Sequence, residues 1–187
     1  EEQREQTKKR NKLLYQSEHD ELTGLYNKRS LNRYLEDVFE DCKLNEKELG
    51  ILFLDIDYFK QLNDRYGHGK GDEGICAVAD TLKRIFPEDY VARYGGDEFL
   101  VVMPERDLAY AMEHAESLCA GIREYKIPNE DSELEPWLTI SVGGVCAIPK
   151  EPNRVWDFLS AADNTLYEQK KEQKGKVRFY QGEGKYL

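Results

Sequence analysis

Two adjacent carboxylates, Asp97 and Glu98, stand at the tip of what the sequence predicts to be a tight hairpin. Strand-forming residues lie on both sides of them, at positions 90–94 and 99–103. The Gly-Gly pair before the acids supplies the positive φ that a two-residue hairpin turn needs. Two acids that follow two glycines suit a place where a cation and a phosphate approach the main chain, because glycine has no side chain to block the approach. The simpler alternative is an ordinary turn with solvated acids.

A second pair of acids follows a short apolar segment. Residues 50–54 read Gly-Ile-Leu-Phe-Leu and predict a buried strand, and Asp55 and Asp57 come directly after it. In a strand these two side chains would point to the same face. Burial of unpaired carboxylates is costly, and a divalent cation with oxygen ligands would compensate for it. Alternatively, Asp57 caps a helix that starts near Tyr58, which leaves Asp55 unexplained.

A short helix and a glycine-rich turn are expected next. Apolar side chains recur at helical spacing over residues 58–66, and glycines follow over residues 67–72. Asn63 and Asp72 could read a base, because an amide both donates and accepts while a carboxylate accepts from N–H groups. As isolated residues they are more simply explained as turn and cap residues. The Gly-x-Gly here does not follow a strand, so a dinucleotide fingerprint is rejected.

Taken in order, these segments resemble the GGDEF family, the diguanylate cyclases. The resemblance runs from about His19 to Tyr180, and its name-giving motif is present without a departure. It implies a palm-like, ferredoxin-related fold shared with nucleotidyl cyclases. The motifs that carry it are His19-Asp20-Glu21-Leu22-Thr23-Gly24-Leu25-Tyr26-Asn27-Lys28-Arg29, Asp55-Ile56-Asp57-Tyr58-Phe59-Lys60, Asn63-Asp64, Gly67-His68, Gly71-Asp72, residues 93–99, Thr139-Ile140-Ser141-Val142-Gly143 and Ala162-Asp163-Asn164-Thr165-Leu166-Tyr167.

The resemblance also implies an activity and the residues that carry it. The family condenses two GTP into cyclic di-GMP and releases two pyrophosphates, so two domains must face each other, at least transiently. Asp97 and Glu98 would be catalytic, with Asp97 helping to activate the 3′-hydroxyl. Asp55, the Ile56 carbonyl, Asp97 and Glu98 would bind Mg²⁺ or Mn²⁺, two ions per site. Substrate contacts would come from Asn63 and Asp72 at guanine, Lys170 at the triphosphate, and Phe59, Lys60, His68, Gly95 and Gly96.

Some positions depart from the family pattern or refine it. Many members carry an Arg-x-x-Asp inhibitory site before the hairpin, and here Phe86 replaces the Arg while Asp89 is retained. Phe cannot provide the bidentate fork of Arg, so we expect no strong feedback inhibition through that site. Asp72 favours guanine, so GTP is expected over ATP. The second basic phosphate contact could be Lys174 or Lys176.

Composition limits the classes of partner. The chain has 187 residues and a net charge of −10, which argues against a nucleic-acid duplex or an anionic membrane surface as partner. Its four cysteines are widely spaced and are expected to be free thiols in a reducing compartment. No segment has the length of a transmembrane helix, so we expect a cytoplasmic domain, whose full-length protein could be membrane-anchored.

Apolar periodicity predicts the remaining elements. Residues 1–18 are highly charged and are expected to be a linker helix below an upstream sensory domain, and residues 19–187 to be the cyclase domain. Helices are expected over residues 29–45, 72–86, 107–125 and 155–173, and further strands over 137–147 and 176–181. This order predicts an α+β fold with a mostly antiparallel five-stranded sheet flanked by helices. The alternative function is a catalytically silent GTP-binding regulatory module.

Overall fold

A single five-stranded sheet organises the chain. The computed structural model describes residues 1–182 and 187. The strands run in the order β2-β3-β1-β4-β5, and every neighbouring pair is antiparallel except the parallel pair β4–β5. The prediction of an α+β fold with a mostly antiparallel sheet is therefore confirmed. The elements are α1 (Glu2–Glu18), α2 (Lys28–Leu44), β1 (Leu49–Ile56), α3 (Phe59–Tyr66), α4 (His68–Ile85), β2 (Tyr90–Gly95), β3 (Glu98–Pro104), α5 (Leu108–Glu124), β4 (Ile140–Ala147), α6 (Val155–Glu172) and β5 (Val177–Phe179).

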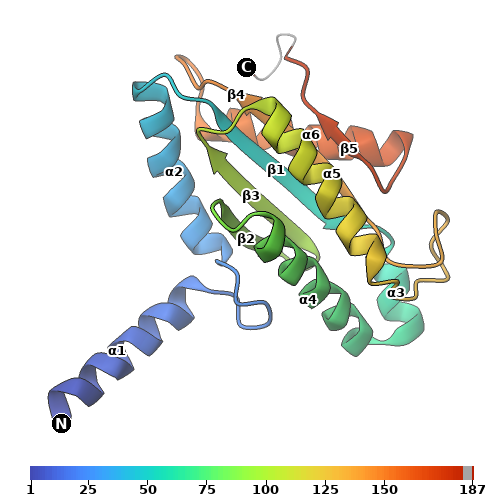
Figure 1. Cartoon of the computed structure of the whole chain (residues 1–187), viewed down its shortest axis with the longest axis horizontal. Coiled ribbons are helices and arrows are strands. Elements are labelled where there is room, and N and C mark those ends of the chain that lie inside the picture. Colours follow the sequence, from blue (N-terminus) through green and yellow to red (C-terminus); the bar gives the residue numbers. More distant parts are fainter. Residues whose placement is uncertain (183–186) are drawn as a thin grey trace.

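Helices cover both faces of the sheet (Figure 1). Along the central strand β1, Leu52 and Leu54 pack with α4 and α5, whereas Ile51 and Phe53 pack with α2 and α6. This alternation follows from the period-two geometry of a strand. It also explains why β1 is apolar from Leu49 to Leu54, since a strand covered on both faces needs no polar side. Because β1 is buried along its whole length, its acidic C-terminal end is held in a fixed position.

Local geometry differs from the sequence expectation at two turns. The hairpin turn consists of Gly96 and Asp97, and neither Gly95 nor Gly96 adopts a positive φ. Instead, the pairing of β2 with β3 shifts register between Arg93 and Gly95, and this irregularity lets the chain reverse direction. The expected glycine-rich turn after α3 shrinks to Gly67, whose φ is 85°, because α4 already begins at His68.

Helix α1 extends away from the rest of the molecule (Figure 1) and buries no side chain. Its last turn is nevertheless attached to the domain by a continuous stack of rings. Ring centroids lie 3.8–4.6 Å apart from Tyr15 through His19, Tyr26 and Tyr90 to Tyr34. Such stacks stabilise a contact beyond the area they bury. Within residues 1–182 and 187, no helix is long and apolar enough to cross a membrane.

The packing of β4 against α6 requires a residue without a side chain at position 143. A Cβ atom added at Gly143 would lie 2.6 Å from the Leu166 Cα and closer still to the Ala162 carbonyl oxygen. These are backbone atoms of α6, so they cannot move aside as a flexible side chain would. At Gly69, in contrast, an added Cβ meets no atom within 4 Å.

We therefore predict that Gly143→Ala lowers the free energy of unfolding by about 3 kcal/mol or more, since overpacked cores force backbone shifts. Gly69→Ala is the matched control and should leave stability unchanged or slightly raised, because Ala favours a helix. Urea denaturation followed by circular dichroism measures both. Equal midpoints for the two variants would contradict the tight β4–α6 contact.

Candidate active site

The pairing of β1 with β3 places three acidic residues on neighbouring stretches of backbone. Asp55, at the end of β1, stands directly opposite Glu98, at the start of β3. The Ile56 amide donates a hydrogen bond of 3.3 Å to the Asp97 carbonyl oxygen, so the hairpin tip is attached to the end of β1. The sequence predicted this meeting of a strand end and a hairpin tip. The roles assigned to these residues as ligands stay predictions.

Lys170 from α6 compensates part of this negative charge. Its Nζ atom lies 2.6 Å from Asp55 Oδ2, and the pair is largely buried. Burial lowers the pKa of Lys170, but the hydrogen bond and ion pair with Asp55 outweigh it, so the net shift is upward. The other Asp55 oxygen, Oδ1, is buried and has no hydrogen-bond partner among the described residues. An unpaired buried carboxylate oxygen is rare in folded proteins and indicates a place for a ligand.

Burial shifts the titration of the whole cluster. It raises the pKa of Asp55 to about 6, although the hydrogen bond from Lys170 acts in the opposite direction. The pKa of Asp97 is raised by burial too. For Glu98, burial and the neighbouring Asp97 charge both raise the pKa. Each of these acids therefore loses its proton at a higher pH than a solvated acid does, as expected for buried acids in a low-dielectric site.

Asp57 has a structural environment that the sequence did not predict. Its carboxylate accepts hydrogen bonds from the Thr139 hydroxyl at 2.8 Å and from the Ser141 hydroxyl at 2.6 Å. It lies beyond the end of β1, so the strand alternation that would align it with Asp55 no longer applies. Nor does it cap α3, whose N-cap is Tyr58 without a side-chain bond. Asp57 instead ties the end of β1 to β4.

A cavity of about 480 Å³ lies beside the acids and contains much of the predicted substrate site. Lys174 lines this cavity and Lys176 is not among its lining residues, which favours Lys174 as the second basic contact. The sequence did not identify Tyr58 as a residue of this site. Its φ of 53° places its backbone in the left-handed region, and the Lys174 Nζ atom lies 4.7 Å from the centroid of its ring. The lining residues are Ile56, Tyr58, Phe59, Lys60, Gln61, Asn63, Asp64, His68, Asp97, Lys170 and Lys174.

Other predicted residues lie outside this lining. Asp55 and Glu98 reach the site through the β1–β3 pairing, whereas Asp72 is an exposed residue in the second turn of α4. Gly95 and Gly96 belong to the hairpin and do not line the cavity either. No contact of the described structure brings Asp72 to the acids, so its role at guanine stays a prediction.

Arg93 fixes the hairpin tip from the side opposite β1. Its guanidinium donates two hydrogen bonds to the Gly96 carbonyl oxygen, at 2.8 and 3.0 Å, and a third nitrogen contacts Asp20 at 3.2 Å. The Asp20 carboxylate also accepts hydrogen bonds from the backbone and hydroxyl of Thr23. Both residues belong to motifs noted in the sequence, but their pairing across 73 positions gave no sequence signal.

The degenerate inhibitory position is closed. Phe86 is only 1% exposed and belongs to the core. The Asp89 carboxylate accepts a 2.6 Å hydrogen bond from the Tyr110 hydroxyl and lies 3.5 Å from Arg106. Asp89 thus has partners within the domain, and no arginine stands at the position of Phe86.

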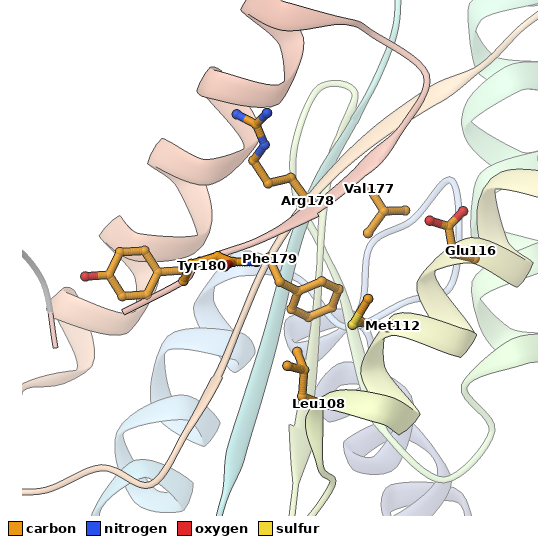
Figure 2. A pocket seen from close by; sticks show the side chains of 8 residues that line it. Leu108, Met112, Glu116, Val177, Arg178, Phe179 and Tyr180 are labelled. Atoms are coloured by element: carbon orange, nitrogen blue, oxygen red, sulfur yellow. The ribbon is translucent and has the colours of Figure 1, made fainter. Parts of the chain in front are cut away.

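A separate cavity of about 570 Å³ lies between α5 and β5. Figure 2 shows Phe179 pointing toward Met112 and Leu108, which makes this space largely apolar. None of the predicted site residues lines it. The arrangement of acids, lysines and Asn63 at the end of β1 is therefore the candidate active site.

Since folding raises the pKa of Asp55, the folded state holds its proton at pH values where the unfolded chain has lost it. The contribution of Asp55 to stability should therefore be greatest below about pH 4 and fall as the pH rises toward about 6, by at most about 3 kcal/mol. Asp55→Asn should flatten this slope, because it removes the titrating group. Urea titrations between pH 4 and 7, with the exposed Asp80→Asn as control, measure the effect; an unchanged slope in Asp55→Asn would contradict it.

Comparisons with known proteins identify the family. The family model described as "Diguanylate cyclase, GGDEF domain" matches residues 17–176. A probable diguanylate cyclase of Escherichia coli, DgcC, is 32% identical over 162 residues, which cover 86% of this chain and 42% of that protein. The chain thus spans about two fifths of the length of this curated relative.

Solved structures show the same fold. The coiled coil and GGDEF domain of DgcB from Caulobacter crescentus, in complex with c-di-GMP, superposes with a TM-score of 0.86 at 23% identity and covers 95% of this chain and 93% of that one. The GGDEF domain of TpbB from Pseudomonas aeruginosa reaches 0.75 at 29% identity, covering 87% and 94%. On the family match, which includes every acid of the site, this chain belongs to the GGDEF family.

Proposed function

We propose that this domain is a diguanylate cyclase, which joins two GTP into cyclic di-GMP and releases two pyrophosphates. The observation that carries the proposal is the buried, unpartnered Oδ1 atom of Asp55, held beside Asp97 at a cavity lined by Lys170 and Asn63. Silent relatives usually lose acids of the hairpin, and this chain keeps all of them. The enzyme is therefore favoured over a silent GTP-binding module.

The donor chemistry fits a divalent cation. Asp55 offers a buried carboxylate oxygen without a partner, and Asp97, Glu98 and the Ile56 carbonyl are oxygen donors from the neighbouring strand ends. In the part of the chain that the structure describes, no three His, Cys, Asp or Glu side chains already stand around one metal position, so the ion would draw these donors together. Hard cations such as Mg²⁺ or Mn²⁺ prefer this chemistry. Bound there, two such ions would neutralise the carboxylates and the phosphates and polarise the α-phosphorus.

The protein residues bind and orient the nucleotide. Lys170 and Lys174 line the cavity and would hold the triphosphate, while Asn63 would hydrogen-bond guanine together with Asp72. Asp97 would accept the proton of the 3′-hydroxyl, and its burial-raised pKa suits a base better than that of a solvated acid. A new bond then forms from the 3′-oxygen to an α-phosphorus, and the α–β phosphate bond breaks to release pyrophosphate.

The reaction needs two copies of the domain. Each site holds one GTP, whereas the product joins two, so two domains must present their sites to each other. The exposed helix α1 would connect such a pair to an upstream sensory domain, in a protein that is longer than this chain. We assign the domain to the cytoplasm on the same proposal, because GTP is its substrate.

The cyclase activity is tested by incubating concentrated protein with GTP and Mg²⁺ and separating the products by chromatography. We expect cyclic di-GMP from the wild type, and a loss of at least about 100-fold in Asp97→Asn, which removes both a base and a metal ligand. Asp80→Asn should retain activity. Binding of GTP without any product, even at high concentration, would instead support the silent module.

The closed inhibitory position predicts a second property of the enzyme. We expect micromolar cyclic di-GMP to cause no non-competitive inhibition, because Asp89 is bonded to Tyr110 and Phe86 offers no fork for a phosphate or a guanine. Tyr110→Phe removes one hydrogen bond of Asp89, leaves Arg106 beside it and restores no arginine at position 86, so it should remain uninhibited. Initial rates at several GTP concentrations measure this, and strong non-competitive inhibition of either protein would refute the expectation.

A further inference from the structure

Asn63 lies directly over a glycine of the neighbouring helix. Asn63 belongs to α3 and Gly71 to the first turn of α4, and the two helices are joined by Gly67 alone. A Cβ atom added at Gly71 would lie 2.9 Å from the Asn63 Cγ atom and closer still to its Oδ1 atom. Such separations are shorter than any carbon contact that packing tolerates. The Asn63 amide can occupy its place only because residue 71 has no side chain.

The amide held in this way lines the cavity beside Asp97. Its Oδ1 atom, which is the Asn63 atom nearest to Gly71, is buried and has no hydrogen-bond partner among the described residues. A buried carbonyl oxygen without a partner is unfavourable. Residue 71 therefore fixes an acceptor that nothing in the folded domain satisfies.

Helix formation itself does not explain a glycine here. Gly71 has no positive φ and lies within α4, where Ala has the higher helix propensity. The contact with Asn63 gives this glycine a packing reason. The atoms that a Cβ would meet belong to the end of a flexible side chain, so Ala would rotate the Asn63 amide away and leave the two helices in place.

We propose that Gly71 is a specificity-determining positioning residue, which selects guanine by holding the Asn63 amide in its binding orientation. The inference rests on the proposed function and deepens it, because it adds a residue that never touches the nucleotide. Gly71 acts through Asn63 alone. Its substitution should therefore change the preference between purine bases and leave the metal and triphosphate contacts unaffected.

Gly69 provides a matched control on the same helix. An added Cβ at Gly69 meets no atom within 4 Å, and its replacement by Ala carries the same gain in helix propensity. Any difference between Gly71→Ala and Gly69→Ala therefore reports the displaced amide.

The test is a double-mutant cycle on nucleotide binding. Equilibrium dissociation constants for GTP and ATP, supplied as α,β-methylene analogues that cannot release pyrophosphate, are measured by calorimetry with Mg²⁺. The proteins are the wild type, Gly69→Ala, Gly71→Ala, Asn63→Ala and the double variant Asn63→Ala/Gly71→Ala. We expect Gly71→Ala to weaken GTP binding about tenfold with little change for ATP, as the loss of a hydrogen bond to the base would do. In the Asn63→Ala background the same change should have no further effect.

The possible outcomes separate the inference from the function on which it rests. An unchanged GTP-to-ATP ratio in Gly71→Ala, or an equal loss in the Asn63→Ala background, would overturn the inference while the cyclase proposal stands. Failure of Gly71→Ala to fold would also overturn it, since rotation of Asn63 is argued to relieve the clash; melting curves of all variants detect this. A wild type that binds no GTP would overturn the proposed function itself and the inference with it.

Discussion

The site depends on one constraint, the antiparallel register of β1 and β3. This register places Asp55 opposite Glu98 and joins the backbone of Ile56 to that of Asp97. Burial and the charges of Asp97 and Asp57 both raise the pKa of Asp55, so a nearby cation stabilises its ionised form. Lys170 supplies this cation from a different element, with its Nζ atom 2.6 Å from Asp55. The architecture around the sheet serves to keep this unfavourable cluster in place.

Burial on both faces makes the placement rigid. Because α2, α4, α5 and α6 cover the sheet, β1 cannot shift along β3 or β4 without moving its apolar residues to the wrong face. The buried network of Asp57 with Thr139 and Ser141 fixes the end of β1 to β4 as well. The Ser141 hydroxyl also accepts a hydrogen bond from the Gly175 amide, which positions the loop that carries Lys174. Hydrogen bonds thus hold both the end of β1 and the loop of Lys174 against β4.

The sequence predicted the parts of the site that depend on local pattern. Apolar runs ending in acids identified Asp55 and the acidic hairpin, and antiparallel pairing was enough to bring them together. Contacts between distant segments gave no such signal: Lys170 meets Asp55 across 115 positions, and Asp57 meets Ser141 across 84. Backbone conformation was also missed at two places: Tyr58 has a positive φ that its residue type does not predict, and the hairpin glycines lack the positive φ that was expected of them. Tertiary packing, not residue type, decides the sign of φ at these positions.

The hairpin tip has a second support, and it comes from the segment that follows α1. On one side the tip is bonded to β1 through Ile56, and on the other Arg93 connects the Gly96 carbonyl to Asp20. Asp20 stands two residues beyond the end of α1, whose last turn is attached to β2 by the stack of rings from Tyr15 to Tyr34. The α1 exit and the acidic tip are thus joined by direct contacts. A helix that buries no side chain along its length is therefore connected to the chemistry at the one end where it meets the domain.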